Sequence, residues 1–163
     1  GAIRRRATPQ TRREPARRRQ DRQDRQDKPM TSPDAPLHLA SPDILAGHLA
    51  ALYAPDTAQD PARWNPERPS TGHCAVVALL VQDVFGGDLI RATGVNADGP
   101  VVHYWTKTPD YGPLDLTADQ FVGGAVFERF EVRARDRLLA DPDTRARYAR
   151  LKARLHARLA SAS

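Results

Sequence analysis

Cysteine occurs once in this sequence of 163 residues, at Cys74, and His103 and Asp115 follow it. A thiolate, an imidazole and a carboxylate in contact can carry out acyl transfer. The sulfur attacks a carbonyl carbon, the imidazole moves the proton, and the carboxylate holds the imidazole in one tautomer. Each residue alone is more often a packing or capping residue. Their order, each on an element suited to its task, favours a catalytic triad of nucleophile, base and orienting acid.

Cys74 lies where a turn-rich segment, residues 64–72, gives way to an apolar run that ends at Gly86-Gly87. The run has the length of a helix, and a glycine pair is a typical helix end. We therefore expect a buried helix with Cys74 in its first turn. The unpaired N–H groups and the positive end of the helix dipole at that position favour a thiolate.

His103 lies within residues 101–106, which are rich in β-branched and aromatic side chains and predict a strand. A preceding strand is predicted over residues 88–95, with a turn at 96–99. Because side chains alternate along a strand, His103 and Trp105 share a face. A short third strand, Leu114-Asp115-Leu116, would set the carboxylate beside the imidazole and raise the imidazole pKa.

Further elements surround this centre. Ser41-Pro42 predicts a helix start, and apolar residues continue at helical spacing to Tyr53. Thr117 is expected to cap a brief helical turn. Residues 126–132 predict a fourth strand with one face made by four side chains, Val126, Glu128, Phe130 and Val132. Helices are expected near residues 134–140 and 142–159, the second with a solvated basic face. The prediction is an α+β fold: an antiparallel sheet of about four strands packed on the cysteine helix, with helices before and after.

The positive charge is concentrated at the beginning of the chain. Residues 1–29 hold eleven Arg or Lys and four acidic residues, a balance of +7, and the remainder, with fourteen and sixteen, has −2, which together give the net +5. Residues 1–40 are therefore predicted to be a disordered basic tail and linker, and residues 41–160 one domain. A native start at Met30 is an alternative to a functional basic arm.

Several classes of protein are disfavoured by composition. No run of about 18 apolar residues exists, so no membrane span is expected. A single cysteine rules out an internal disulfide and fits the reducing cytoplasm, where we expect the protein. No cofactor is expected. Nucleic-acid binding is expected only through the basic tail.

A metal site is the weaker alternative for the same residues. Cys74, His73, His103 and Asp115 could together bind zinc. Adjacent ligands such as His73 and Cys74 are unusual, however, and no Cys-x-x-Cys or His-Glu-x-x-His pattern occurs. No metal is therefore predicted.

Taken together, these motifs resemble the YunG-like family of small bacterial proteins over roughly residues 40–155. The resemblance is carried by Arg91 and five stretches of sequence: Trp64 to Pro69, Gly72-His73-Cys74-Ala75-Val76, Phe85-Gly86-Gly87-Asp88, His103-Tyr104-Trp105, and Asp115 to Phe121. The spacing is more distantly similar to transglutaminase-like domains of the papain-like thiol superfamily. That resemblance implies the same triad and a papain-like or transglutaminase-like fold.

One position departs from the expected pattern. The resemblance leads us to expect Gln before the cysteine, where its amide could donate to the oxyanion, but His73 stands there. His73 can donate in one tautomer or when charged. We assign His73, Trp64 and Trp105 as candidate oxyanion or substrate-binding residues.

Three functions remain open. The first is a thiol enzyme that hydrolyses or transfers an amide, ester or isopeptide acyl group of a small molecule or peptide. The second is a binding module on the same fold that performs no chemistry. The third is an anion or nucleic-acid binder that acts through the tail. The sequence favours them in this order and leaves substrate and oligomeric state undetermined.

Overall fold

The computed structural model describes residues 36–162, and the predicted disordered tail, residues 1–29, lies outside them. Within that range the helices are α2 (Pro42–Ala50), α3 (Cys74–Phe85), α4 (Arg135–Leu139) and α5 (Pro142–Ser161). The strands are β1 (Asp88–Asn96), β2 (Gly99–Thr108), β3 (Gly112–Leu114) and β4 (Val126–Arg133). The expected α+β class with a four-stranded antiparallel sheet is confirmed.

Helix α2 begins where the sequence predicts. The Ser41 side chain accepts a hydrogen bond from the Ile44 N–H, and Pro42 occupies the first helical position. Leu45 and Leu49, four residues apart, are buried on the inner face. None of the helices in residues 36–162 combines the length and the apolar character needed to cross a bilayer.

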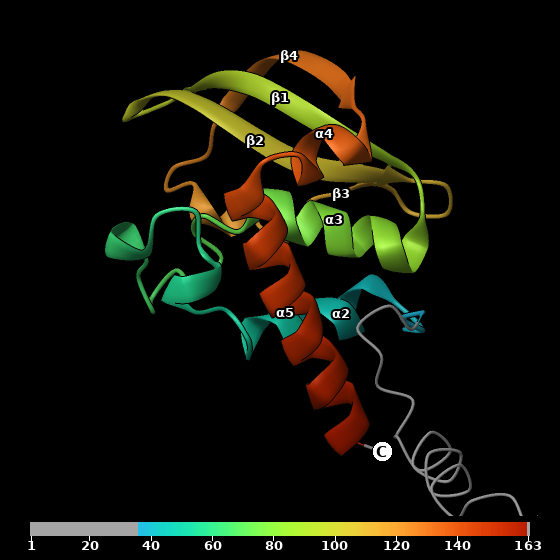
Figure 1. The fold of residues 1–163 in the computed structure, drawn as a ribbon. Coiled ribbons are helices and arrows are strands. Elements are labelled where there is room, and N and C mark those ends of the chain that lie inside the picture. The colour runs from blue at the N-terminus through green and yellow to red at the C-terminus, as the bar shows by residue number, and fades with distance from the viewer. Residues whose placement is uncertain (1–35, 163) are drawn as a thin grey trace, which may run out of the picture. The chain divides into compact units, whose positions relative to one another are not determined.

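Helix α3 is the centre of the core. Its residues 76–81 are all buried, as expected for a helix that is apolar all round. It ends at Gly86, which has a φ of 74° and therefore suits glycine. Figure 1 shows α3 beneath the sheet, with α5 crossing α3 on the side away from the sheet. Tyr148, Leu151 and Leu155 of α5 are buried in the same core, as their spacing predicts.

The sheet has the strand order β3-β2-β1-β4. Strands β1 and β2 form a hairpin closed at Asn96 and Gly99, at the predicted turn. Ala92 pairs with His103, so the register of this hairpin fixes the position of the histidine. The Thr106 hydroxyl donates to the Ala78 carbonyl of α3 at 2.7 Å, which shows that Thr106 faces the helix layer.

The predicted faces of β4 are wrong at its beginning. Thr93 pairs with Arg129, but Gly94 pairs with Phe127, so Glu128 is the extra residue of a β-bulge. The bulge brings Phe127 to the same face as Phe130, and both rings contact Trp105. The sequence cannot reveal this, because a bulge interrupts the two-residue period on which the prediction rests.

Gly94 allows the close approach of β4 at the bulge. A Cβ at position 94 would lie 1.9 Å from the Val126 carbonyl oxygen. Gly94→Ala is therefore expected to lower the free energy of unfolding by about 2 kcal/mol, because the backbone of β4 must move.

Gly47→Ala in α2 is the control: its Cβ meets nothing within 4 Å. It should stabilise the protein by about 0.5 kcal/mol. Urea unfolding of both variants tests this, and equal stability of Gly94→Ala and wild type would contradict it.

Candidate active site

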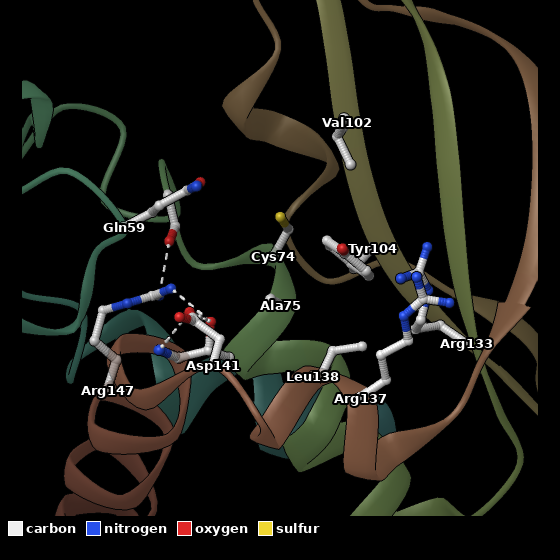
Figure 2. A pocket seen from close by; sticks show the side chains of 12 residues that line it. Gln59, Cys74, Ala75, Val102, Tyr104, Arg133, Arg137, Leu138, Asp141 and Arg147 are labelled. Carbon is white, nitrogen blue, oxygen red and sulfur yellow. Dashed lines mark hydrogen bonds between the residues drawn. The ribbon is translucent and has the colours of Figure 1, made fainter.

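Cys74 is the first residue of α3 and is half-buried. His73 is the N-cap, but its side chain makes no capping bond, so the first turn of a twelve-residue helix has no side-chain cap. Figure 2 shows the sulfur directed away from α3, between Gln59 on one side and Val102 and Tyr104 on the other. The thiol therefore lies at the positive end of the helix, beside open space.

His103 lies in the middle of β2, and its side chain is fully buried. Its Nε2 is 2.6 Å from Asp115 Oδ2. The rings of Trp105, Phe121 and Phe127 surround the imidazole at centroid distances of 5.8, 4.8 and 5.6 Å. The carboxylate and the aromatic rings together fix the orientation of the imidazole.

The sequence predicts Asp115 to lie within a third strand at residues 114–116. In the structure β3 ends at Leu114, and Asp115 directly follows it. Its Oδ1 accepts hydrogen bonds from the Thr117 N–H at 3.1 Å and the Thr117 hydroxyl at 3.3 Å. This local side-chain bond replaces strand pairing and ends β3 at Leu114. The brief helical turn is present at Ala118–Gln120, but the Thr117 side chain makes no capping bond there.

Gln120 is a member of this cluster that the sequence analysis missed. Its Oε1 accepts from the Gly72 N–H at 3.3 Å, which fixes the orientation of the amide. Its Nε2 is thereby directed to His103 Nδ1 at 3.1 Å and to the Thr117 hydroxyl at 3.3 Å. When His103 is neutral, this arrangement places its proton on Nε2, facing Asp115, and Nδ1 accepts from the amide. The Nδ1 lone pair of neutral His103 is therefore occupied by the Gln120 amide.

The segment from Asp115 to Gln120 brings the cysteine helix and β2 together. Gln120 bonds both Gly72 and His103, and Asp119 accepts from the Ser70 hydroxyl at 2.7 Å. Because β3 pairs only with residues 106–108, this segment lies along the remaining part of the β2 edge. The start of α3 is thus tied to the strand that carries the histidine.

The protonation of His103 depends on several opposing influences. Burial lowers its pKa, while the hydrogen bond to Asp115 and the electrostatic interactions with Cys74 and Asp115 raise it, with a balance at about 9. The bond from Gln120 acts against protonation, because its N–H occupies the site of the second proton. Cys74 therefore influences the charge of His103. Neither His103 nor Asp115 lines the pocket beside the thiol, and hydrogen bonds link the start of the cysteine helix to His103 through Gly72 and Gln120.

His73 does not face the space beside Cys74. Its ring is fully buried, with Nε2 2.7 Å from the Thr57 hydroxyl and Nδ1 3.0 Å from the Thr71 carbonyl. Tyr53 packs on it at a centroid distance of 4.6 Å. Burial lowers the pKa of His73 to about 4, so the ring is neutral at pH 7. Both nitrogens hold the loop together, and the predicted oxyanion role of the side chain stays a prediction.

Trp64 and Trp105 lie outside the set of residues that line the pocket beside Cys74. The Trp64 indole donates to the Pro69 carbonyl at 3.0 Å and closes the loop ahead of α3. Trp105 packs against His103 and Phe127 on the sheet face opposite Thr106. Their observed contacts are structural, and substrate binding by either stays a prediction.

Arg147 is buried, although the basic face of α5 was predicted to be solvated. Its guanidinium donates to the carbonyls of Thr57 and Gly72 at 3.4 and 3.5 Å, and to Asp143 at 2.8 Å. Arg147 therefore positions the loop that precedes Cys74, a role that helical periodicity does not reveal.

A pocket of about 350 Å³ opens beside Cys74. Gln59, Gly72, Val102 and Tyr104 lie around the thiol, and residues of β4, α4 and α5 form the remaining walls. A small acyl group fits a space of this size. In the described part of the chain, no three His, Cys, Asp or Glu side chains are arranged to hold a metal ion.

Comparison with known proteins identifies a protein family, but no individual relative. No curated protein and no solved structure matches the chain. The model of the YunG protein family matches residues 41–160, which include α2, the cysteine helix, the sheet and nearly all of α5. We conclude that the chain belongs to the YunG protein family.

Proposed function

We propose that this protein is a thiol-dependent acyl-transfer enzyme in which Cys74 is the nucleophile, His103 the base and Asp115 the residue that orients His103. The observation that carries the proposal is the 2.6 Å bond between the buried His103 and the half-buried Asp115, together with a half-buried cysteine that lies at the start of a helix and next to a pocket. The order of the three residues is that of transglutaminase-like thiol enzymes, and a distant relationship to them is part of the proposal.

The chemistry proceeds through a thioester. Transfer of the thiol proton to His103 Nδ1 gives a thiolate–imidazolium pair and displaces the Gln120 amide from that nitrogen. The sulfur bonds to the carbonyl carbon, the bond to the leaving nitrogen or oxygen breaks, and the leaving group takes the proton from Nδ1. N–H groups in the first turn of α3 are placed to stabilise the oxyanion. Water or an amine then attacks the thioester, gives its proton to His103, and releases the thiolate.

Alkylation of the single cysteine tests the proposal without a known substrate. At pH 7 a free thiol is only a few per cent ionised. Cys74 in the folded protein is expected to react with iodoacetamide about tenfold faster than the same cysteine in the urea-unfolded chain, because the imidazolium stabilises the thiolate. Mass spectrometry gives both rates, and the unfolded chain is a matched control. Folded protein that reacts no faster than the unfolded chain would exclude an activated nucleophile.

A binding module without chemistry is the second candidate, and the Gln120–His103 bond favours it. If Gln120 never leaves Nδ1, the imidazole stays neutral and the thiol is not ionised. The pocket would then bind a ligand without forming an acyl-enzyme. In that case Cys74→Ser would leave ligand binding unchanged, and no thioester would accumulate with an activated ester.

A further inference from the structure

The pocket beside Cys74 has a basic wall on the side away from the helix start. Arg133, the last residue of β4, and Arg137 of α4 both line it, with Leu138 between them and α3. Figure 2 shows both arginines beyond Tyr104 as seen from the sulfur. A group bonded to the Cys74 sulfur and extending past Tyr104 would therefore meet two guanidinium groups.

The positive charge of this wall is only partly balanced. Glu131 is the carboxylate beside these arginines. Arg133 donates a hydrogen bond to Glu131, and a guanidinium nitrogen of Arg91 lies 3.6 Å from the same carboxylate. Arg137 interacts with Glu131 by longer-range electrostatics, without a hydrogen bond. Within residues 36–162 the guanidinium of Arg137 has no hydrogen-bond or ion-pair partner. One carboxylate thus faces three guanidinium groups, and the donors of Arg137 are available to a ligand.

The remaining charges of the pocket do not cancel this excess. Arg147, on the opposite wall, is paired with Asp143. Asp141 accepts hydrogen bonds from the Thr144 N–H and hydroxyl, at 3.0 and 2.7 Å, and so caps α5. Asp141 stays charged, because these bonds hold its pKa below the usual value, but it is the single acidic side chain among the lining residues, against three arginines.

We propose that Arg133 and Arg137 bind an anionic oxygen group, a carboxylate or a phosphate, on the substrate whose acyl group is transferred to Cys74. The planar guanidinium matches both groups, because two parallel N–H donors meet two oxygens. The substrate class is then an amide or ester with an anionic group on the acyl side, a short chain away from the reacting carbonyl. Its meaning for catalysis rests on the proposed function, but the binding of an anion can be measured separately.

Three alkylating probes of similar length test this. Bromoacetyl-β-alanine ends in a carboxylate, bromoacetyl-aminoethylphosphonate ends in a phosphonate, and bromoacetyl-β-alaninamide is the neutral match. We expect an anionic probe to label Cys74 about tenfold faster than the amide at low salt, because its anion pairs with Arg137. The preference should fall in 0.5 M NaCl, as expected for a partly exposed ion pair. Which anionic probe is faster distinguishes a carboxylate from a phosphate substrate.

Variants identify the residue responsible. Arg137→Gln should bring the ratio of the anionic-probe rate to the neutral-probe rate down towards one. Arg158→Gln, at the other end of α5 where Arg158 bonds His48, should leave this ratio unchanged. As a second measurement, free glutarate or inorganic phosphate should slow labelling by iodoacetamide in the wild type and not in Arg137→Gln.

The outcomes separate this inference from the function on which it rests. Rapid labelling by the neutral probe, with no anion preference and no protection by glutarate or phosphate, would overturn the anion site alone. Labelling by the neutral probe no faster than that of the unfolded chain would overturn the activated cysteine. An anion preference that persists in Arg137→Gln would place the site elsewhere and also refute the assignment.

Discussion

His103→Gln is expected to slow the acylation of Cys74 by 4-nitrophenyl acetate at pH 7 by about 10²- to 10⁴-fold, the usual contribution of a positioned acid–base group. The imidazole is buried, bonded to Asp115 and within interaction range of the thiol, and its pKa is raised to about 9. Glutamine keeps a similar volume and can bond Asp115, but it neither accepts the thiol proton nor balances a thiolate. Burst kinetics of nitrophenolate release give the rate.

The control for this loss is the same substitution at another histidine. His48 lies in α2 and bonds Arg158, far along the chain from the triad. His48→Gln should therefore keep the wild-type acylation rate. Circular dichroism checks that both variants are folded. A folded His103→Gln protein that is acylated as fast as wild type would remove His103 from the mechanism.

Acidification is expected to destabilise the protein through His73 by about 3 kcal/mol. The pKa of this ring is about 4 in the folded protein and 6.5 in the unfolded chain, and each unit corresponds to about 1.4 kcal/mol. Between these values the unfolded state binds the extra proton. The stability is therefore fully present above pH 6.5 and is lost as the pH falls towards 4. The ring is fully buried, so solvent does not screen the effect.

Urea unfolding at pH 7.0 and 4.5 measures this loss. His73→Gln is the reference, because it removes the titrating group while an amide can still bond Thr57 or Thr71. The variant is expected to be less stable at pH 7 but to lose less stability on acidification than wild type. His103, whose pKa is raised to about 9, adds stability as the pH falls from 7 through 6.5 and so opposes the loss, but it does this in wild type and variant alike and drops out of their comparison. Parallel losses in variant and wild type would show that His73 is not the titrating group.

Much of the architecture is encoded in local patterns. Ser41-Pro42 predicts the start of α2, and the apolar run that begins at Cys74 and ends at Gly86 predicts α3. The β1–β2 hairpin and the spacing of Tyr148, Leu151 and Leu155 are equally readable. These features depend on residues a few positions apart, where capping bonds and periodicity act directly. The candidate residues Cys74, His103 and Asp115 can be chosen from the sequence by their side-chain chemistry and by the predicted elements that carry them.

The features that the sequence does not reveal depend on contacts between distant segments. The bulge at Glu128 arises because Gly94 of β1 lets Val126 of β4 approach, and it changes which residues share a face. Asp115 leaves the predicted strand because its carboxylate bonds Thr117. Neither outcome follows from hydrophobic alternation, because each results from one close contact that overrides a periodic preference.

The sequence by itself determined the fold class, the helix that begins at Cys74 and the three residue types that could perform acyl transfer. Only the tertiary structure decided how they are held: Gln120 joins Gly72 to His103, Arg147 is buried against the loop before Cys74, and Arg133 and Arg137 meet on one pocket wall. Helical and strand periods describe which face of an element is apolar. They do not describe hydrogen bonds across 17 to 75 residues of chain, because such bonds have no period in the sequence.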